Sequence, residues 1–352
     1  MKIWENMLYM EDVINTAKMN LPWERLQNKK IIISGARGLI GSFLIDVLMY
    51  KNQTGLNCKV IAMGRDEGKL RKRFEYGESS KMIEYLIGDV NDYSCVNKIE
   101  KVDYIVHLAS MTHPIEYATH PIETITTNII GINNMLMLSE KCNAERVVFA
   151  SSNEIYGENR GDTEKFDEKY CGYIDCNTLR AGYPESKRCG EALCQAYIKQ
   201  KNLDVVIARL TRSYGPTLLD SDTKAMSQFL HKAIDGQDIV LKSNGTQYYS
   251  YTYVSDAVAG LLTVMLLGKC GEAYNIADEK SDIRLKDLAE IIADNVGKKV
   301  IYDIPNEIES IGYSKATKAR LDSTKLRELA WTAIYDINSG ISRTIRILKQ
   351  SV

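Results

Sequence analysis

The sequence predicts an α/β fold, a doubly wound parallel sheet with a smaller C-terminal region. Three observations carry this prediction. Short and nearly continuous apolar runs alternate with helical segments from about residue 30, a glycine-rich turn follows the first run, and the alternation loosens after about residue 215. Strands that are apolar throughout and separated by helices are typical of a parallel sheet covered on both faces.

The elements follow this alternation in order along the chain. Strands are expected over the apolar runs, whose β-branched residues favour extended backbone, and helices over the segments between them. The first 28 residues carry no strand pattern, and we expect them to form a helical arm on the outside of the molecule. The expected strands cover 31–34, 59–63, 82–87, 103–108, 146–151, 204–210 and 299–302, and the expected helices cover 42–50, 68–76, 122–141 and 285–296.

The chain divides into three expected parts. A helical arm covers 1–28, the sheet domain covers 29–215, and residues 216–352 form a further region that returns segments to the main sheet. Within this last region, 216–260 and 271–330 are expected to be rich in loops. Because ligands of such sheets bind at the carboxyl ends of the strands, we expect the cleft between the two larger parts.

The composition is that of an ordinary globular protein. The chain has 352 residues, 45% of them hydrophobic, and 45 Lys and Arg residues stand against 46 Asp and Glu residues. The net charge of −1 provides no overall attraction to nucleic acid or to anionic membranes, and no apolar run is long enough to cross a bilayer. The eight cysteines form no CxxC pair and the four histidines no paired ligand spacing, so we expect reduced thiols, a cytoplasmic location and no metal site.

Residues 35–41 lie between the first strand and the first helix and contain three glycines. Gly35 allows a sharp turn, Gly38 allows the backbone to approach a pyrophosphate, and Gly41 allows the helix to pack closely on the strand. The helix that begins here offers free N–H groups to a phosphate. The sequence therefore predicts a dinucleotide-binding Rossmann domain, followed by a mainly substrate-binding region. The loop residues expected to bind the cofactor are Gly35, Arg37, Gly38, Leu39, Ile40 and Gly41.

The end of the second strand bears on the choice of dinucleotide. NAD sites usually carry a carboxylate there, which hydrogen-bonds the ribose 2′-hydroxyl. In this chain Gly64 stands at that place, followed by Arg65, whose charge suits a 2′-phosphate, and by Asp66. We expect NAD or NADP, with Gly64 and Arg65 favouring NADP and Asp66 leaving NAD open.

The run from Tyr183 to Lys187 has the pattern YxxxK and opens a helix. Residues four apart lie on one helix face, and an ammonium group near a phenol favours the phenolate and lowers the pKa of the phenol. A phenolate at neutral pH can remove the proton of an alcohol as a hydride leaves. Upstream, Ser151 and Ser152 end an apolar strand and bring hydroxyls to the same edge. These residues predict a site that oxidises an alcohol.

Eight motifs, in order, carry a resemblance to a known family. They are GARGLIG (35–41), GDV (88–90), HLAS (107–110), TNIIG (127–131), SSNEIYG (151–157), YPESK (183–187), RLTRSYGP (209–216) and SYTYVSD (250–256). From about residue 30 to 335 the chain resembles the extended short-chain dehydrogenase/reductase (SDR) family, which contains nucleotide-sugar epimerases, dehydratases and decarboxylases. The stretch 107–157 is most similar to UDP-glucuronate decarboxylases.

The resemblance implies a role for each matching residue. Ser152 would hydrogen-bond the sugar C4 oxygen, Tyr183 would be the base for the C4 hydroxyl, and Lys187 would hold the nicotinamide ribose and tune Tyr183. Asp89 would contact the adenine, with Val90 packed against it. The cofactor would first oxidise the sugar and later reduce it, and so return to its starting state. The further cofactor contacts that the resemblance implies are Leu108, Ala109, Ser110 and Asn128, and the further substrate contacts are Thr112, Asn153 and Arg180.

Glu154 indicates chemistry beyond C4. Sugar 4,6-dehydratases carry an acid–glutamate pair after the hydroxyl residue. This chain has Asn153 and Glu154 at these two positions. Decarboxylases and GDP-mannose dehydratases likewise have a neutral residue before the glutamate. Simple 4-epimerases usually need no such glutamate. We therefore rank C4 oxidation followed by decarboxylation or dehydration-type chemistry first, a nucleotide-sugar 4-epimerase second, and a net NADPH-dependent 4-ketoreductase third. Outside the enzyme class, the alternative is a catalytically idle dinucleotide-binding regulatory protein.

The chain departs from the family at charged positions. Arg212 replaces the asparagine that usually precedes the YGP run, and Tyr249 replaces the arginine of the GTQxR run. Both positions face the nucleotide diphosphate in the family, so we expect Arg212 to supply the charge missing at Tyr249. Arg320 is shifted by one residue from the arginine that decarboxylases place before a Pro-Asp pair. Because bidentate recognition of a carboxylate is geometrically strict, this shift counts against UDP-glucuronate itself as the substrate.

The partners follow from the resemblance and from the composition. The implied substrate is a nucleotide-diphosphate sugar. Family members commonly pair two long helices per subunit in a four-helix interface, here 122–141 and 184–200, so a homodimer is implied. No nucleic acid and no membrane partner is expected.

Overall fold

The computed structural model describes residues 1–112, 114–304 and 317–351. Its centre is a sheet of β1 (Lys30–Ser34), β2 (Lys59–Gly64), β3 (Ile83–Ile87), β4 (Tyr104–His107), β5 (Arg146–Ser152), β6 (Val205–Leu210) and β10 (Ala273–Ile276). The strand order is β10-β6-β5-β4-β1-β2-β3, and every neighbouring pair is parallel. The predicted fold class is confirmed, and the direction of strand addition reverses between β1 and β4.

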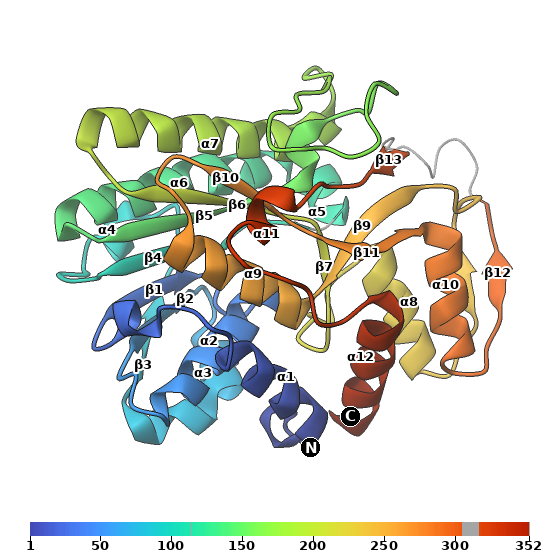
Figure 1. The fold of residues 1–352 in the computed structure, drawn as a ribbon, viewed down its shortest axis with the longest axis horizontal. Helices are drawn as coiled ribbons and strands as arrows, with labels where there is room; N and C mark the ends of the chain where they lie inside the picture. The colour runs from blue at the N-terminus through green and yellow to red at the C-terminus, as the bar shows by residue number, and fades with distance from the viewer. Residues whose placement is uncertain (113, 305–316, 352) are drawn as a thin grey trace.

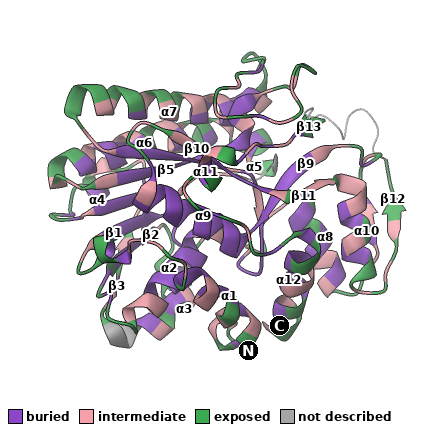
Figure 2. Ribbon diagram, viewed as in Figure 1, coloured by how far each residue is buried: buried purple, intermediate pink, exposed green. Residues whose placement is uncertain are grey.

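Helices cover both faces of this sheet (Figure 1). They are α2 (Leu39–Asn52), α3 (Glu67–Phe74) and α9 (Val254–Leu267) on one face, and α4 (Tyr93–Val96), α6 (Pro121–Cys142) and α7 (Gly182–Lys201) on the other. Successive residues of a strand point to opposite faces, and accordingly Ile31 and Ile33 join one core cluster while Ile32 joins the second. Burial from both sides, visible in Figure 2, is the reason that these strands are apolar throughout.

The C-terminal region adds two smaller sheets beside the main one. In the larger, β9 (Tyr248–Tyr253) pairs with β11 (Asp278–Arg284), β13 (Lys318–Ala319) and β7 (Arg212–Tyr214). In the smaller, β8 (Ile239–Leu241) pairs with β12 (Val300–Tyr302). The region also holds α8 (Ala225–Ile234), α10 (Leu285–Asp294), α11 (Thr324–Arg327) and α12 (Ile337–Ser351). Thr217 Oγ1 donates a 2.8 Å hydrogen bond to the Leu39 carbonyl, which ties this region to the glycine loop.

The stretch 216–260 has the expected loop segments at 216–224 and 242–247, but it also contains helices and strands that were not predicted. This stretch contains α8, β8, β9 and the first half of α9. The sequence of α9 shows no helical period because almost all of its residues are buried, so that it is apolar all round. Within 271–330 the expected helix and strand are present as α10 and β12, together with β10, β11, β13 and α11. Residues 305–316 of that stretch lie outside the described part of the chain.

The first 28 residues are helical, but they are not an outer arm. They form η1 (Ile3–Glu5), α1 (Met7–Ala17) and η2 (Trp23–Leu26). Tyr9 and Val13 have no exposed surface, and α1 packs on α2 and α9. Asp12 accepts a 2.6 Å hydrogen bond from Tyr253 and pairs with Arg343 of α12 at 2.7 Å. The segment therefore belongs to the core, because its apolar face is needed to cover the helices beneath it.

Asp256, in the first turn of α9, connects the main sheet layer to the chain before α12. Its two carboxylate oxygens accept hydrogen bonds from the backbone N–H groups of Ile334 (2.8 Å) and Tyr335 (3.0 Å). Burial raises the pKa of Asp256 to about 7, while these hydrogen bonds act in the opposite direction. Because the pKa is about 4 in an unfolded chain, the stabilising contribution of this proton is fully present below about pH 4. It is lost as the pH rises through about 7.

We predict that Asp256→Asn removes this pH dependence. Between about pH 4 and pH 8 the free energy of unfolding of the wild type should fall relative to that of the variant by a few kcal/mol. Urea denaturation across this range measures the difference. Asp336→Asn is the control, since hydrogen bonds from Ser339 lower the pKa of Asp336 and keep it ionised over the same range. Parallel curves for the wild type and Asp256→Asn would contradict the prediction.

Candidate active site

The candidate site lies at the carboxyl edge of the main sheet. β1, β4 and β5 end there side by side, and the strand order reverses between β1 and β4. Open sheets of this kind bind their ligands at such a point. The first turns of α2 and α7 begin at the same edge, so the glycine loop and the YxxxK pattern face one cleft region.

The glycine loop turns tightly between β1 and α2. Gly35 has a φ of +68°, and a Cβ there would lie 2.9 Å from backbone atoms of Leu108 and Ala109. A Cβ at Gly41 would lie 2.5 Å from the Gly35 carbonyl oxygen, so both positions require glycine. Gly38 is the N-cap of α2 and has no side chain to cap it. The first N–H groups of α2 are therefore directed at an anion such as a pyrophosphate.

Charged side chains surround the outer end of the loop. Arg37 and Arg65 are exposed, while Leu39 and Ile40 are partly exposed at the start of α2. Asp66 caps α3, where its carboxylate accepts a 2.9 Å hydrogen bond from the Lys69 N–H and pairs with the Lys69 ammonium at 3.0 Å. These contacts, and the nearby Arg37 guanidinium, lower the pKa of Asp66. The Asp66 carboxylate, which could bind the ribose of NAD, is thus already bound to the start of α3.

The chain after β3 forms the next part of the edge. Asp89 is partly exposed, and its side chain accepts a 2.8 Å hydrogen bond from the Asn91 N–H. Val90 is nearly buried, and its carbonyl accepts a 2.8 Å hydrogen bond from Asn134. The exposed part of the Asp89 side chain can therefore contact a ligand, whereas Val90 is a fixed apolar side chain at this edge.

His107 ends β4 and fixes the loop that follows. Its Nδ1 lies 2.8 Å from Ser34 Oγ, which also accepts hydrogen bonds from the N–H groups of Leu108 and Ala109 at 3.2 Å. Burial, and secondarily Lys187, lowers the pKa of His107 to about 3, so the ring is neutral. Because the Ser34 oxygen accepts twice, its proton points to the imidazole. The partly exposed Leu108 and Ala109 are thereby held at the cleft.

Asn128 does not lie where a cofactor contact was expected. It has no exposed surface, its Oδ1 accepts a 2.7 Å hydrogen bond from Ser110, and its Nδ2 donates to Ser186 at 2.9 Å. Ser186 donates in turn to the Tyr183 carbonyl at 2.8 Å. A side chain without accessible surface cannot touch a dinucleotide in this conformation. Asn128 therefore positions Ser110, which is partly exposed, and the start of α7.

Tyr183 and Lys187 lie in the first turns of α7 against the end of β5. Lys187 Nζ donates a 2.8 Å hydrogen bond to the Ala150 carbonyl, and the side chain is 2% exposed. Burial lowers the pKa of Lys187 to about 7, and Glu191 acts in the opposite direction. Ser152, the last residue of β5, lies close enough to Tyr183 for its hydroxyl to lower the pKa of the phenol. The structure thus brings together the three residues of the expected alcohol-oxidising group.

The effect of Lys187 on the pKa of Tyr183 stays a prediction, because other groups have the larger influence on that pKa in this structure. Burial raises the pKa of Tyr183, and the Glu154 carboxylate raises it further. Lys187 Nζ is 5.9 Å from the centroid of the tyrosine ring and is turned to the backbone. A positively charged nicotinamide in the cleft would act in the lowering direction. The protein groups that lower the pKa of Tyr183 are the hydroxyls of Ser152 and Ser110 and the guanidinium of Arg180.

Glu154 is paired with a cation inside the site. Arg180 Nη2 lies 2.8 and 2.7 Å from the two carboxylate oxygens of Glu154. The Arg180 guanidinium lies 4.8 Å above the ring of Tyr117, and Tyr117 stacks on Tyr183 with 4.9 Å between ring centroids. Tyr117 belongs to α5 (Pro114–Thr119) and was missed by the sequence analysis. It is one of 21 tyrosines, and no motif distinguishes it.

The C-terminal region supplies two more charged residues that the sequence analysis missed. Lys224 Nζ donates a 3.2 Å hydrogen bond to Thr112 Oγ1 and pairs with Asp222 at 3.2 Å. Asp222 contributes to the raised pKa of Tyr117, which burial causes in the main. Asn153, an expected substrate contact, follows Ser152 in the chain and is only 6% exposed. No motif distinguishes Lys224, which is the N-cap residue of α8.

Arg212 and Tyr249, the two departures from the diphosphate-binding pattern, are in contact. The Arg212 guanidinium carbon lies 3.5 Å from the centroid of the Tyr249 ring. β6 ends at Leu210, which pairs with Ser152 of β5, so Arg212 lies just beyond the same edge. The two substitutions are therefore neighbours in space, as a compensating pair must be.

Arg320 points away from that pair. Its guanidinium lies 4.6 Å above the ring of Tyr248, whereas Arg212 lies above the ring of Tyr249. Neighbouring residues of a strand face opposite sides, so Arg320 is on the other face of β9. Ala319 pairs with Tyr249 in the sheet. Arg320 is thus turned away from Arg212 and Tyr249, because a shift of one residue along a strand reverses the face, and its expected substrate contact stays a prediction.

A buried ion pair supports the site from behind. Glu191 accepts hydrogen bonds from Arg209 at 3.0 and 2.7 Å and from Ser151 Oγ at 2.5 Å. Arg209 also donates to the hydroxyl of Tyr156 at 2.9 Å. Because Ser151 precedes Ser152 in β5 and Glu191 follows Lys187 by one turn of α7, this pair locks the two elements in register.

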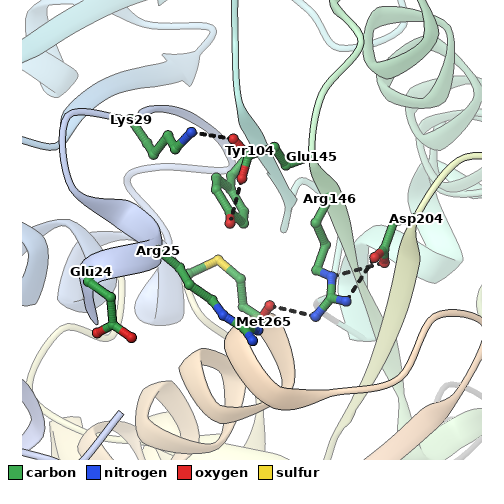
Figure 3. A pocket seen from close by; sticks show the side chains of 8 residues that line it. All are labelled: Glu24, Arg25, Lys29, Tyr104, Glu145, Arg146, Asp204 and Met265. Atoms are coloured by element: carbon green, nitrogen blue, oxygen red, sulfur yellow. Dashed lines mark hydrogen bonds and ion pairs between the residues drawn. The ribbon is translucent and has the colours of Figure 1, made fainter. Parts of the chain in front are cut away.

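A cavity of about 420 Å³ lies at the opposite edge of the sheet (Figure 3). Tyr104, Arg146 and Asp204 line it, and they stand at the amino ends of β4, β5 and β6. Four of its charges form pairs within the lining: Arg146 binds both oxygens of Asp204 at 2.9 and 2.8 Å, and Glu145 binds Lys29. Because it lies at the amino edge, this cavity does not compete with the carboxyl edge as the candidate site.

In the described ranges no helix is both long and apolar enough to span a bilayer. Over the same residues, no three His, Cys, Asp or Glu side chains converge as a metal site would need.

Comparisons with known proteins agree with this geometry. The model of the NAD dependent epimerase/dehydratase family matches residues 31–277. UDP-glucuronic acid decarboxylase 6 of Arabidopsis thaliana is 32% identical over 319 residues, which are 89% of this chain and 87% of that protein. UDP-glucuronic acid decarboxylase 1 of Xenopus tropicalis is 29% identical over 324 residues, which are 92% of this chain and 73% of that protein.

Solved structures share the fold. A dTDP-glucose 4,6-dehydratase from Streptomyces venezuelae with NAD and TYD bound is 23% identical, with a TM-score of 0.78 and coverage of 91% of this chain and 97% of that chain. The UDP-glucose 4-epimerase from Thermotoga maritima with UDP-glucose is 21% identical, also with a TM-score of 0.78, and covers 91% and 99%. The resemblance to the extended SDR family is thereby confirmed, and the chain belongs to the NAD dependent epimerase/dehydratase family.

Proposed function

We propose that this protein oxidises the C4 hydroxyl of a nucleotide-diphosphate sugar with bound NAD(P) and then carries out decarboxylation or dehydration-type chemistry. The observation that carries the proposal is the meeting of Ser152, Tyr183 and Lys187 at the end of β5, with Glu154 two residues beyond Ser152. The names of the relatives support a C4-centred reaction, because decarboxylases, dehydratases and 4-epimerases occur among them.

The residues at the carboxyl edge fit a dinucleotide. The uncapped start of α2 would receive the pyrophosphate, and Asp89 and Val90 would meet the adenosine end. Ala109 and Ser110 would lie along the diphosphate and ribose, and Lys187 would meet the nicotinamide ribose. When bound, the nicotinamide supplies the hydride acceptor that these side chains lack.

The protein groups divide the proton chemistry between them. Tyr183 takes the proton from the C4 hydroxyl while the Ser152 hydroxyl hydrogen-bonds the same oxygen. Glu154 then acts at C5 and C6. Once its ion pair with Arg180 is broken, the Glu154 carboxylate can accept a proton and return it. A 4-epimerase is the second candidate, and the turning away of Arg320 favours it, since that arginine was the expected anchor for a C6 carboxylate.

Between NAD and NADP, we propose NADP as the cofactor. Arg37 and Arg65 are exposed at the outer end of the glycine loop, Gly64 offers no carboxylate, and Asp66 is engaged by Lys69. The structural relatives named with a dinucleotide carry NAD, so this choice is the point at which the chain would differ from them.

The proposal includes a homodimer of a cytoplasmic enzyme. The outer faces of α6 and α7 carry exposed apolar groups, among them Ile122 at 72% and Ile130 at 41% exposure. Pairing of these faces in a four-helix interface would cover them. A monomeric mass by light scattering at micromolar concentration would contradict the dimer.

We predict that Tyr183→Phe lowers the turnover number by about 100- to 10,000-fold, because it removes the base. Mass spectrometry of the sugar product formed by the wild type identifies the reaction. Loss of carbon dioxide supports the decarboxylase, loss of water the dehydratase, and unchanged mass the epimerase. A Tyr183→Phe protein with wild-type turnover would contradict the proposed role of this residue.

We predict opposite pH shifts for two neighbours of the base. Glu154 raises the pKa of Tyr183 and the Ser152 hydroxyl lowers it. Since the phenolate fraction increases with pH, the alkaline rise in the rate of nicotinamide reduction should move to lower pH in Glu154→Gln and to higher pH in Ser152→Ala. Stopped-flow absorbance in a single turnover measures this rise. Shifts in the same direction, or none, would show that Tyr183 does not control the step.

We predict that Arg65→Ala weakens NADP binding about tenfold and leaves NAD binding unchanged, since one charge-assisted contact to a 2′-phosphate is lost. Fluorescence titration with each reduced cofactor measures both constants. Lys72→Ala, on the exposed side of α3, is the control. An equal effect on NAD and NADP would contradict a role of Arg65 in the choice.

A further inference from the structure

The outer face of β9, opposite the face that carries Tyr249 and Arg212, holds cations that the proposed function does not use. Tyr248 pairs with Arg284 of β11 on one side and with Lys318 of β13 on the other. Directly paired residues of neighbouring strands lie on the same face of a sheet. One cation therefore stands on each side of Tyr248.

Arg320 adds a third cation to this face. It lies two residues beyond Lys318 and thus on the same side of the chain, and its guanidinium carbon is 4.6 Å from the centroid of the Tyr248 ring. The guanidinium carbon of Arg284 is 6.0 Å from the same centroid. Both distances are in the range of cation–π attraction, so two guanidinium groups are held around one ring.

The Arg320 guanidinium has no hydrogen-bond acceptor among the described residues. Its side chain is only 18% exposed, and Nε is buried without a partner. Nη2 lies 3.8 Å from the carboxylate of Glu164, which is beyond hydrogen-bond distance, and the Glu164 side chain is 91% exposed. A mostly buried charged donor without an acceptor is costly. An anion bound at this face would supply the acceptor that Arg320 lacks.

The buried carboxylate of this face is shared with other groups. Asp282 pairs with Ser250, the next residue of β9 on the outer face, and accepts a 2.5 Å hydrogen bond from it. Lys165 lies 3.8 Å from the same carboxylate. Burial raises the pKa of Asp282, and Arg320 is among the groups that lower it. Asp282 therefore balances only part of the positive charge at this face.

The other two cations of the group are open to solvent. Arg284 and Lys318 are both exposed, and within residues 1–112, 114–304 and 317–351 neither side chain has an ion pair or a hydrogen bond. A ligand that approaches the outer face of β9 thus meets three cationic groups, two of which need not exchange a partner to bind it.

We propose that Arg284, Lys318 and Arg320 form a binding site for an oligophosphate chain, free or as part of a nucleoside triphosphate. Guanidinium groups match pairs of phosphate oxygens, and a lysine adds a compact charge. Two guanidinium groups around one ring can bind neighbouring phosphoryl groups of a chain. The site lies outside the cleft, gives Arg320 a ligand other than the substrate sugar, and does not depend on the proposed reaction.

Isothermal titration calorimetry of the full-length, dinucleotide-loaded protein with sodium triphosphate tests the site. The bound dinucleotide fills the glycine loop, and the variants separate the outer face from the rest of the cleft. Wild-type protein should bind triphosphate at this face with an affinity that falls as salt is added. Arg284→Met and Arg320→Met should each weaken this binding about tenfold, and the double variant should lose it.

Matched variants show whether the charge of this face is the cause. Arg346→Met removes an exposed arginine of α12 and should leave triphosphate binding unchanged. Glu164→Gln removes the exposed carboxylate near Arg320 and should strengthen the binding, which a merely structural arginine would not produce. Because methionine keeps an apolar stem on Tyr248, the variants should unfold at the wild-type temperature, as circular dichroism can check.

ATP and inorganic triphosphate distinguish the two sources of the phosphate chain. Equal affinities support recognition of the chain alone, and tighter binding of ATP that is lost in the same two variants supports a nucleotide ligand. ATP binding without triphosphate binding would overturn the inference. So would an absence of binding by the wild type, binding that persists in the double variant, or an equal loss in Arg346→Met.

Discussion

The hydrogen bond from the buried Lys187 ammonium to the Ala150 carbonyl is the contact on which the geometry of the site depends. It joins the second turn of α7 to the end of β5 in one register. Gly190 permits the approach, because a Cβ there would lie 2.6 Å from the ring of Phe149. Once α7 is fixed, Tyr183 at its start lies beside Ser152 at the end of β5. The catalytic geometry is thus a consequence of how one helix packs on one strand.

Opposite charges are paired around this contact. Burial alone would make the Lys187 ammonium costly, and it lowers the pKa of this group to about 7. Glu191 counters that effect while it holds Arg209 and Ser151. Glu154 with Arg180, and Asp222 with Lys224, form the next pairs outward.

The sequence predicted those parts of the molecule in which a local pattern has a single structural meaning. The glycine loop, the apolar parallel strands and the YxxxK helix belong to this group, because backbone freedom, two-sided burial and helix spacing each act over a few residues. Tyr117 and Lys224 were not predictable, since they reach the site only through the packing of α5 and α8. The face on which Arg320 lies was not predictable, because it depends on the register of β13 against β9. The burial of α1 was missed because it depends on partners as distant as Arg343.

The proposed function requires that C4 oxidation is internal and transient, and this can be measured directly. The purified protein would be denatured to identify any released dinucleotide, and the absorbance of reduced nicotinamide would be followed while substoichiometric nucleotide sugar is added to native protein. If the oxidation is internal, a tightly held dinucleotide is reduced and then reoxidised within each turnover. An absence of retained cofactor, together with stoichiometric consumption of added NADPH by a keto-sugar, would contradict it and identify a net reductase.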